Sequence, residues 1–406
     1  MTSIQDVIDR IYRILGDESF QQAVWRSSVH AEERVPRILE AYQYVKRLAE
    51  EVLEARRRSL ERLDELLEKL VRAGERHRVK VYLAGDAVEA REMVGGIVGS
   101  GKLVVFSKSM VAEEIGLREY LAERGNEVWE TDLGQLLIQL EGSKPMHTTA
   151  PAIHLTVEKA SKLVREKLGL ELPRNPRPED IVSAVREFLR EKFYRADYGI
   201  SGANAVAADT ASIVLVENEG NIRLVTGLPE KHIIVAGVEK VVDTLETAVK
   251  QAIVQAAYAG LYPPTYLNVI SGPSSTADIE HRRVYGAHGP REVHLVLVDN
   301  GRTRARGTLL GEQLRCIRCG RCQWECPVWR HTANVWGGPV YGGPMGINWT
   351  AITHSMEEAG ALSLLCLQCG RCDEVCPVEI PLSRIIHWLR RNYVAGLLAE
   401  APPGQP

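Results

Sequence analysis

The chain has 406 residues, of which 45% are hydrophobic and 25% charged, the composition of an ordinary globular protein that can bury a core. Its formal net charge of −3 excludes a global basic field for nucleic acid and a strongly acidic, disordered character. At about 150 residues per domain, two or three domains are expected.

No segment predicts export or membrane insertion. Charged side chains interrupt the N-terminal segment between Asp6 and Arg13, so it lacks the apolar core of a signal peptide. No stretch approaches the roughly 20 apolar residues that span a bilayer. We therefore expect a cytoplasmic protein with no transmembrane segment, peripheral to a membrane at most through its partners.

Residues 1–77 are predicted to form an N-terminal helical region. Neither proline nor glycine occurs between Pro36 and Gly74, and apolar residues recur there at steps of three and four. These residues are Val45, Leu48, Val52, Leu60, Leu63, Leu67 and Leu70. We expect the helices to pack on a neighbouring domain, with a partner-binding arm as the alternative.

Residues 78–305 alternate between short β-rich runs and amphipathic stretches, a pattern typical of a parallel sheet covered by helices. The expected strands are 79–84, 102–109, 127–132, 211–219, 231–237, 266–271 and 292–300. The expected helices are 86–98, 110–125 and 238–260, and prolines within 171–180 mark a surface loop. We interpret this segment as one α/β domain.

Residues 96–102, with the sequence GIVGSGK, nearly match a phosphate-binding P-loop. Leu103 follows, however, where Mg²⁺ binding requires a hydroxyl, and the glycines precede a strand instead of joining a strand to a helix. We reject a nucleotide site here. No G-x-G-x-x-G motif follows an expected strand either, so nothing predicts a dinucleotide fold.

Two groups of polar residues are candidates for binding a small molecule. Ser107 and Lys108 come at the end of the predicted parallel strand 102–109, the edge where open α/β sheets bind ligands. Asn204, Glu217 and Asn218 belong to a segment rich in Gly, Ala, Asn and Ser that leads into the expected strand 211–219, where a tight turn with locally satisfied polar groups is favoured over a binding site. The candidates for a small-molecule pocket are Ser107, Lys108, Asn204, Glu217 and Asn218.

Three weaker signals have ordinary structural explanations. His147 and His154 could be functional, but lone histidines are more often structural. Residues 271–280 are a candidate anion-binding turn, and more often such a segment is just a loop.

All eight cysteines lie after residue 315, in two copies of the run C-x2-C-x2-C-x3-C-P. Clustered thiols in a large chain without an export signal disfavour disulfides and indicate metal. The spacing is that of bacterial ferredoxins, in which thiolates hold [4Fe–4S] cubes. We therefore predict a dicluster domain over 306–406 with two [4Fe–4S] clusters.

In two-cluster proteins the fourth cysteine of each run ligates the other cluster. We therefore expect one cluster on Cys316, Cys319, Cys322 and Cys376, and the other on Cys366, Cys369, Cys372 and Cys326. Gly320 and Gly370 should relieve crowding as each loop closes. Structural zinc, which often uses two separated C-x2-C pairs, fits two complete runs poorly.

Four arginines stand beside the cysteines: Arg315, Arg318, Arg321 and Arg371. Reduction makes a thiolate-bound cluster more anionic, so nearby cations would raise its potential. Alternatively, these side chains face water or a partner subunit. The two interpretations have equal weight.

Long segments of the chain resemble the LUD domain and dicluster segment of the lactate-utilisation protein B family. The resemblance covers about residues 60–385, and its specific segments are 107–121, 128–140, 148–154, 199–229, 270–280, 286–302, 315–328 and 366–382. It implies an α/β LUD domain of the ribose-5-phosphate isomerase and CoA-transferase-like kind, followed by a mainly helical ferredoxin domain.

The resemblance also implies a function. The family's protein is the iron–sulfur subunit of a three-component, non-flavin system that oxidises L-lactate to pyruvate. The implied partners are a cysteine-rich subunit similar to heterodisulfide reductase and a second, smaller LUD protein. Bacterial members usually continue well past the second cysteine run, which this chain does not, and this puts the partner interface and the substrate in doubt.

Three functions therefore stand. The first is an electron-transfer subunit acting on a small 2-hydroxyacid, with lactate first and glycolate second. The second is an electron-transfer module of another redox complex, of the heterodisulfide reductase or glycolate oxidase kind. The third is a non-redox LUD protein that binds a small molecule. No catalytic residue is assigned.

Overall fold

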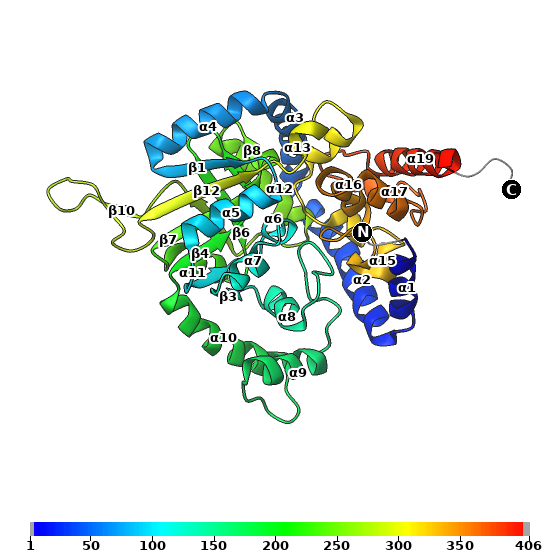
Figure 1. Ribbon diagram of the computed structural model, residues 1–406, viewed down its shortest axis with the longest axis horizontal. Coiled ribbons are helices and arrows are strands. Elements are labelled where there is room, and N and C mark those ends of the chain that lie inside the picture. The colour runs from blue at the N-terminus through cyan, green and yellow to red at the C-terminus, as the bar shows by residue number, and fades with distance from the viewer. Residues whose placement is uncertain (1–3, 401–406) are drawn as a thin grey trace.

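A computed structural model describes residues 4–400 of the chain (Figure 1). The N-terminal region is helical, as predicted. Its helices are α1 (Ile4–Leu15), α2 (Glu18–Ala41), α3 (Tyr44–Glu61) and α4 (Leu63–His77). The carboxylate of Asp17 caps α2 by accepting a hydrogen bond from the backbone N–H of Phe20.

A six-stranded, fully parallel sheet forms the centre of the α/β domain, with the order β1-β12-β7-β4-β2-β3. Its strands are β1 (Val79–Ala84), β2 (Leu103–Phe106), β3 (Glu127–Glu130), β4 (Tyr198–Ser201), β7 (Lys231–Gly237) and β12 (Glu292–Val298). Both faces are covered, because Ile233 packs with one buried cluster while its neighbour Ile234 packs with another. Such burial explains why the strands are almost continuously apolar.

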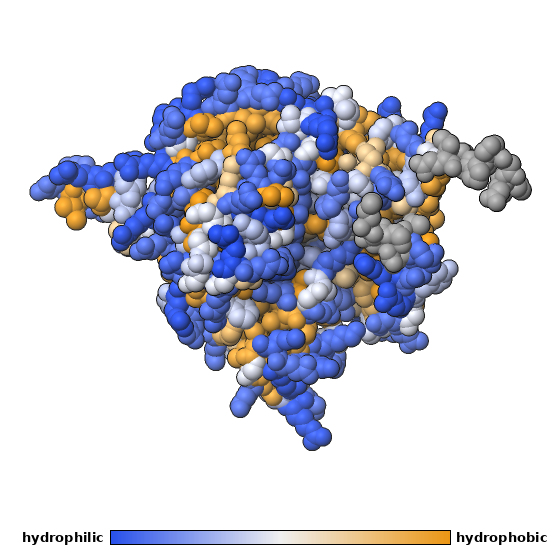
Figure 2. Space-filling model, in the orientation of Figure 1, coloured by the Kyte–Doolittle hydropathy of each residue, from blue (hydrophilic) through white to orange (hydrophobic). Residues whose placement is uncertain are grey.

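Helices cover both faces of this sheet. The elements on one face include α5 (Ala87–Val98), α6 (Met110–Glu114) and α7 (Leu117–Glu123), and α4 packs on the other. On the face drawn in Figure 2 the outer side of α4 is hydrophilic, and apolar side chains lie beneath it toward the sheet. The predicted helix 110–125 is interrupted at Gly116, whose φ of 62° ends α6 and begins α7.

A second, four-stranded sheet has the order β8-β5-β6-β9. Its strands are β5 (Ala205–Ala207), β6 (Ser212–Glu217), β8 (Val241–Val242) and β9 (Tyr266–Ile270), and α12 (Leu245–Tyr258) packs on it. Two of the expected strands, 211–219 and 266–271, therefore belong to this mixed sheet. The predicted helix 238–260 is wrong at its start, because 238–240 form the 3-10 turn η1 (Val238–Lys240) and β8 follows.

The remaining elements of the α/β domain extend from its edges. They are α8 (Leu133–Glu141), α9 (Val157–Leu168), α10 (Pro178–Arg195), α11 (Asn221–Gly227) and the hairpin of β10 (Ser275–Thr276) with β11 (Val284–Tyr285). The proline-rich segment before α10 is a loop, as predicted. The hairpin projects from the domain (Figure 1).

The C-terminal part is mainly helical and forms around large aromatic side chains. Its elements are α13 (Arg302–Ala305), η2 (Leu309–Arg315), α14 (Arg321–Trp324), α15 (Trp329–Thr332), η3 (Ala333–Val335), α16 (Gly343–Thr353), α17 (Met356–Ser363), α18 (Arg371–Glu374) and α19 (Leu382–Glu400). Trp329, Trp336, Trp349 and Tyr341 are fully buried there. The fold class expected from the sequence is confirmed.

The N-terminal helices divide their contacts between the two parts of the molecule. Helices α1 and α2 lie beside α15 and α17 (Figure 1), and the carboxylate of Glu32 pairs with Arg330 at 2.8 Å. Helix α3 packs on α12, and α4 packs on β1. Within residues 4–400, every helix is too short or too polar to cross a membrane.

Candidate functional site

The eight cysteines surround two small cavities. Each cavity is lined by three cysteines of one run and the fourth cysteine of the other run. The first set is Cys316, Cys319, Cys322 and Cys376, and the second set is Cys366, Cys369, Cys372 and Cys326. This grouping coincides with the exchange expected from the sequence.

The two runs build their cysteine loops with the same backbone. Arg318 and Gln368 occupy the left-handed region with φ of 59° and 55°, and each N–H reaches a cysteine sulfur two residues earlier at 3.4 Å. Gly320 and Gly370 follow with φ of 77° and open the short helices α14 and α18. A Cβ on Gly320 would lie 2.6 Å from His147, whereas one on Gly370 would meet nothing within 4 Å.

The donor chemistry suits iron–sulfur clusters. Burial raises the pKa of Cys319 and Cys326 to about 12, and that of Cys376 to about 11, so these thiols need bound cations to ionise. Four cysteines around each cavity supply one thiolate for each iron of a [4Fe–4S] cube.

The two sets differ in exposure. In the first set Cys316, Cys319 and Cys322 are buried and Cys376 is half-buried. In the second set Cys326 and Cys372 are buried, Cys366 is half-buried, and Cys369 is exposed near Leu367, which has 67% of its surface exposed. The second set is therefore the more exposed of the two.

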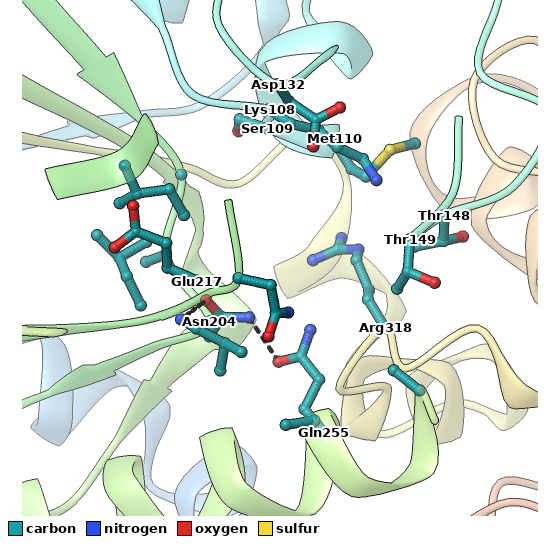
Figure 3. Close-up of a pocket in the computed structure, with 18 of the residues that line it drawn as sticks. Lys108, Ser109, Met110, Asp132, Thr148, Thr149, Asn204, Glu217, Gln255 and Arg318 are labelled. Atoms are coloured by element: carbon teal, nitrogen blue, oxygen red, sulfur yellow. Dashed lines mark hydrogen bonds between the residues drawn. The ribbon is translucent and has the colours of Figure 1, made fainter. Parts of the chain in front are cut away.

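A cavity of about 390 Å³ lies between the carboxyl ends of the sheet strands and the first cysteine set (Figure 3). Lys108 follows β2, Asp132 follows β3, and Lys240 follows β7. Arg318 enters from the opposite side, out of the first cysteine run. Ligands of open α/β sheets bind at this end of the strands, so the cavity is the candidate small-molecule site.

Four of the five predicted pocket residues line this cavity, and Ser107 does not, because its side chain is buried beside β2. The amide of Asn204 bonds Gln255 at 2.8 Å and accepts the N–H of Val216. Both polar atoms of the Asn204 side chain are therefore engaged in hydrogen bonds within the protein.

The two remaining polar candidates are likewise committed to neighbours. Glu217 accepts hydrogen bonds from Asn268 and the N–H of Arg223, and Asn218 accepts one from Thr265. These bonds fit the interpretation favoured from the sequence, in which the polar side chains form hydrogen bonds with neighbouring protein groups.

The charged residues that the sequence interpretation missed are Lys240, Asp132 and Glu219. Burial, with repulsion from Arg318, lowers the pKa of Lys240 to about 7. Glu219 is exposed as a residue, yet partial desolvation of its carboxyl group and repulsion from Asp132 raise its pKa to about 7. Burial also lowers the pKa of Lys108. No local motif marks these residues, because their proximity depends on connections that return from separate strands.

A buried ion network fixes Arg318. Its Nη1 donates to Glu239 at 2.7 Å, and Arg302 donates to the other oxygen of Glu239 at 2.6 Å. Arg302 also forms a two-pronged pair with Glu114, at 2.8 and 2.7 Å. Burial opposes ionisation of Glu239, yet Arg302 and Arg318 hold its pKa well below the usual range. The network joins the α/β domain to the first cysteine loop.

The other flanking arginines have local partners. Arg315 pairs with Glu312, and Arg321 pairs with Glu325 at 2.5 Å, while Arg371 is exposed. The set thus divides, with three buried side chains near the cysteines and one facing water.

The lone histidines have structural positions. His147 is buried against Trp324, with 3.8 Å between ring centroids, and its Nε2 lies 3.2 Å from the carbonyl of Gly320. Burial lowers the pKa of His147 to about 3. His154 lies 3.1 Å from Glu141. Residues 271–280 belong to the projecting hairpin, away from the cavity.

Comparison with known proteins finds matches to both parts of the chain. Residues 67–298 match the family model described as the LUD domain, and residues 312–380 match that of the 4Fe-4S dicluster domain. With the cysteine sets above, the second match shows that the chain holds two [4Fe–4S] clusters.

Curated relatives match over most of the chain. The Lactate utilization protein B of Bacillus velezensis is 38% identical over 345 residues, covering 84% of this chain and 70% of that protein. A protein of Escherichia coli K12 named "Uncharacterized electron transport protein YkgF" is 33% identical, covering 98% of this chain and 83% of that protein.

One solved structure also matches, a DUF162 family protein from Deinococcus radiodurans. It is 16% identical, with a TM-score of 0.30, and it covers 58% of this chain and 98% of that chain. So low a TM-score carries no argument about the fold.

Proposed function

Because the chain belongs to the lactate utilization protein B family, we propose that it is the iron–sulfur electron-transfer subunit of a complex oxidising L-lactate or another 2-hydroxyacid. One observation carries this proposal. The cavity of the LUD domain is walled by Arg318, which stands between Cys316 and Cys319. A small molecule bound there would lie beside the first cysteine set.

The ligand assignment follows the two cavities. Cys316, Cys319, Cys322 and Cys376 would hold one cluster, and Cys366, Cys369, Cys372 and Cys326 would hold the other. A [4Fe–4S] cluster supplies one-electron transfer when bound, so two clusters suit oxidation of a 2-hydroxyacid to a 2-oxoacid, which releases two electrons and two protons.

The chain's own residues can manage the protons. A general base works best when its pKa is near the operating pH. Glu219 meets this condition, because it lines the cavity, where partial desolvation and repulsion from Asp132 raise its pKa to about 7 although the residue is reached by solvent. Lys108 lies in the same wall, where its positive charge would stabilise the ionised carboxylate of Glu219.

The surface set of cysteines suits electron transfer to partners. Cys369 and Leu367 are exposed in the same loop, so a partner could approach the second cysteine set there. The proposed partners are a cysteine-rich heterodisulfide reductase-like subunit and a second LUD protein, and the proposed setting is the cytoplasm.

Lactate-dependent reduction of the complex tests this function. The chain is purified anaerobically with its two partners, its iron is counted, and L-lactate or glycolate is titrated while EPR follows the clusters. We expect about eight irons per chain and reduction by L-lactate. A complex with full iron that dithionite reduces but neither acid reduces would contradict the substrate assignment.

One relative supports a second candidate function. The Escherichia coli protein whose match covers 98% of this chain is named as an electron transport protein, and its name gives no substrate. If dithionite reduces the clusters but 2-hydroxyacids do not, the chain is better described as an electron-transfer module of another redox complex.

A further inference from the structure

We propose that Lys240 and Arg318 form a binding site for the carboxylate of a small monoanionic acid, in the cavity beside the first cysteine set. The inference rests on the proposed function in one respect, since it names the groups that would hold that function's substrate. The site was not among the residues expected from the sequence.

Both cations are buried and incompletely paired. Lys240 is 3% exposed and lines the cavity, and within residues 4–400 its ammonium group forms no hydrogen bond or ion pair. Arg318 is 5% exposed, its Nη1 donates to Glu239, and its guanidinium lies over the rings of Trp349 and Tyr341, at 4.5 and 5.1 Å from their centroids. Within the described residues, its Nε and Nη2 have no hydrogen-bond partner. Leaving buried charged donors without partners is costly, so such groups indicate an anion.

The position of the two cations points the same way. Arg318 and Lys240 both line the cavity, where a ligand can reach them, and they lie close enough to repel each other. An anion bound between them would relieve that repulsion.

The opposite wall restricts the kind of anion. Asp132, Glu217 and Glu219 line the cavity together with Lys108, and Glu217 is paired with Arg223 at 3.3 Å. Asp132 and Glu219 would therefore repel a second negative group placed beside them. Figure 3 shows Asp132 and Glu217 across the cavity from Arg318. One carboxylate at Lys240 and Arg318, with a neutral hydroxyl or carbonyl toward the acidic wall, therefore fits. This is the chemistry of a 2-hydroxy or 2-oxo monocarboxylate, whereas dicarboxylates and nucleotides are disfavoured.

Binding of pyruvate tests the site without relying on turnover. The holo chain is purified anaerobically, and pyruvate, L-lactate and malate are titrated by calorimetry. The main variant is Lys240→Met, which keeps an unbranched side chain only one atom shorter, removes the charge, and breaks no hydrogen bond or ion pair within the described residues. Lys162→Met, on the exposed face of α9, is the matched control. Iron content and the EPR spectrum verify that each variant holds its clusters.

We expect the wild-type chain to bind pyruvate more tightly than malate. Lys240→Met should weaken pyruvate binding by about tenfold or more, the loss for one charge-assisted hydrogen bond, and Lys162→Met should leave it unchanged. Arg318→Lys, which keeps the charge but loses the planar donors, should weaken it as well. Equal affinity of Lys240→Met and the wild type, or no pyruvate binding by the wild type, would overturn the site.

The outcome is separable from that of the proposed function. If pyruvate binds through Lys240 but lactate fails to reduce the complex, the site stands and the lactate assignment falls. If lactate reduces the complex while Lys240→Met binds pyruvate normally, the function stands and the site falls.

Discussion

Single backbone positions organise the cysteine loops. Arg318 and Gln368 adopt the left-handed conformation that residues with a Cβ seldom take, and each N–H then points at a cysteine sulfur. Arg318 also contributes its side chain to the cavity and to Glu239. One residue therefore couples a proposed cluster loop to the proposed ligand site, so its substitution should affect both.

The exchange of Cys326 and Cys376 is testable with two matched variants. Both replace Cys366, Cys369 and Cys372 by Ser, and they differ in whether Cys326 or Cys376 is the fourth cysteine replaced. The variant that loses Cys326 keeps the set Cys316, Cys319, Cys322 and Cys376, so about four irons should remain per chain. The variant that loses Cys376 keeps one intact run but not one cavity set.

Iron analysis and EPR after anaerobic purification distinguish these variants. We expect a stable cluster only where Cys376 is retained. The opposite result, a cluster held by the intact first run alone, would show that each run binds its own cluster. Circular dichroism controls for loss of the fold.

At the scale of elements, short strands and tight packing place the cavity. Strand β4 lies between β2 and β7 in the sheet, and its carboxyl end leads to the cavity residues 202–204. Gly199 in β4 approaches α11 so closely that an added Cβ would lie 1.8 Å from the carbonyl oxygen of Val225. The absence of a side chain at Gly199 therefore sets the position of α11 against the sheet.

Substitution of Gly199 by Ala should disturb this packing. We expect a loss of about 1–3 kcal/mol in the free energy of unfolding, as for other overpacked sites, because α11 must move away from β4. Gly96→Ala is the control, since Gly96 is exposed within α5 and a Cβ there would meet nothing within 4 Å. A helical alanine in its place should stabilise by up to about 1 kcal/mol.

Anaerobic thermal unfolding separates the two glycine variants. Gly199→Ala should unfold at a lower temperature than the wild type, and Gly96→Ala at the same temperature or higher. Equal midpoints for both variants would show that α11 yields to the new methyl group without cost.

At the scale of the molecule, the two parts are joined by a buried, charged interface and by the N-terminal helices. Glu239 and Glu114 hold Arg302 and Arg318, and Tyr341 adds its hydroxyl to Glu114 at 2.6 Å. The first cysteine set, which this network joins to the LUD domain, is the more buried, and the second set reaches the surface at Cys369. We therefore expect an inner cluster at the first set and an outer cluster at the second.

The difference in exposure predicts an order of cluster loss. Oxidative damage follows access, so limited treatment with ferricyanide should destroy the cluster at the outer set first. Iron should fall to about half before the inner cluster is affected, and spin coupling between the clusters should disappear at that stage. The variant that lacks Cys326, Cys366, Cys369 and Cys372 is the control, because it holds only the inner set.

EPR and iron analysis along an oxidation time course check this order. In the control variant, the remaining cluster should survive as long as the inner cluster of the wild type. Simultaneous loss of both clusters, or earlier loss of the inner one, would contradict the assignment of inner and outer sites.

The sequence alone determined the features that depend on local spacing. Cysteines at fixed intervals indicated two [4Fe–4S] clusters, and the periods of apolar residues indicated the N-terminal helices and most strands of the α/β domain. The errors fell where small residues weaken such periods. Strands β4 and β5, built from residues such as Gly199 and Ala205, were not predicted, and helix α12 was predicted to begin at residue 238 although it begins at Leu245.

Only the tertiary structure decided which side chains share the cavity. Lys240, Asp132 and Arg318 come from segments far apart in the chain, and parallel strands with returning connections bring them to one edge. Their burial and their incomplete pairing arise only when the fold brings these segments together, so no local sequence pattern predicts them. Asn204 and Glu217 were proposed from composition, yet their hydrogen-bond partners decided that they mainly support the cavity wall.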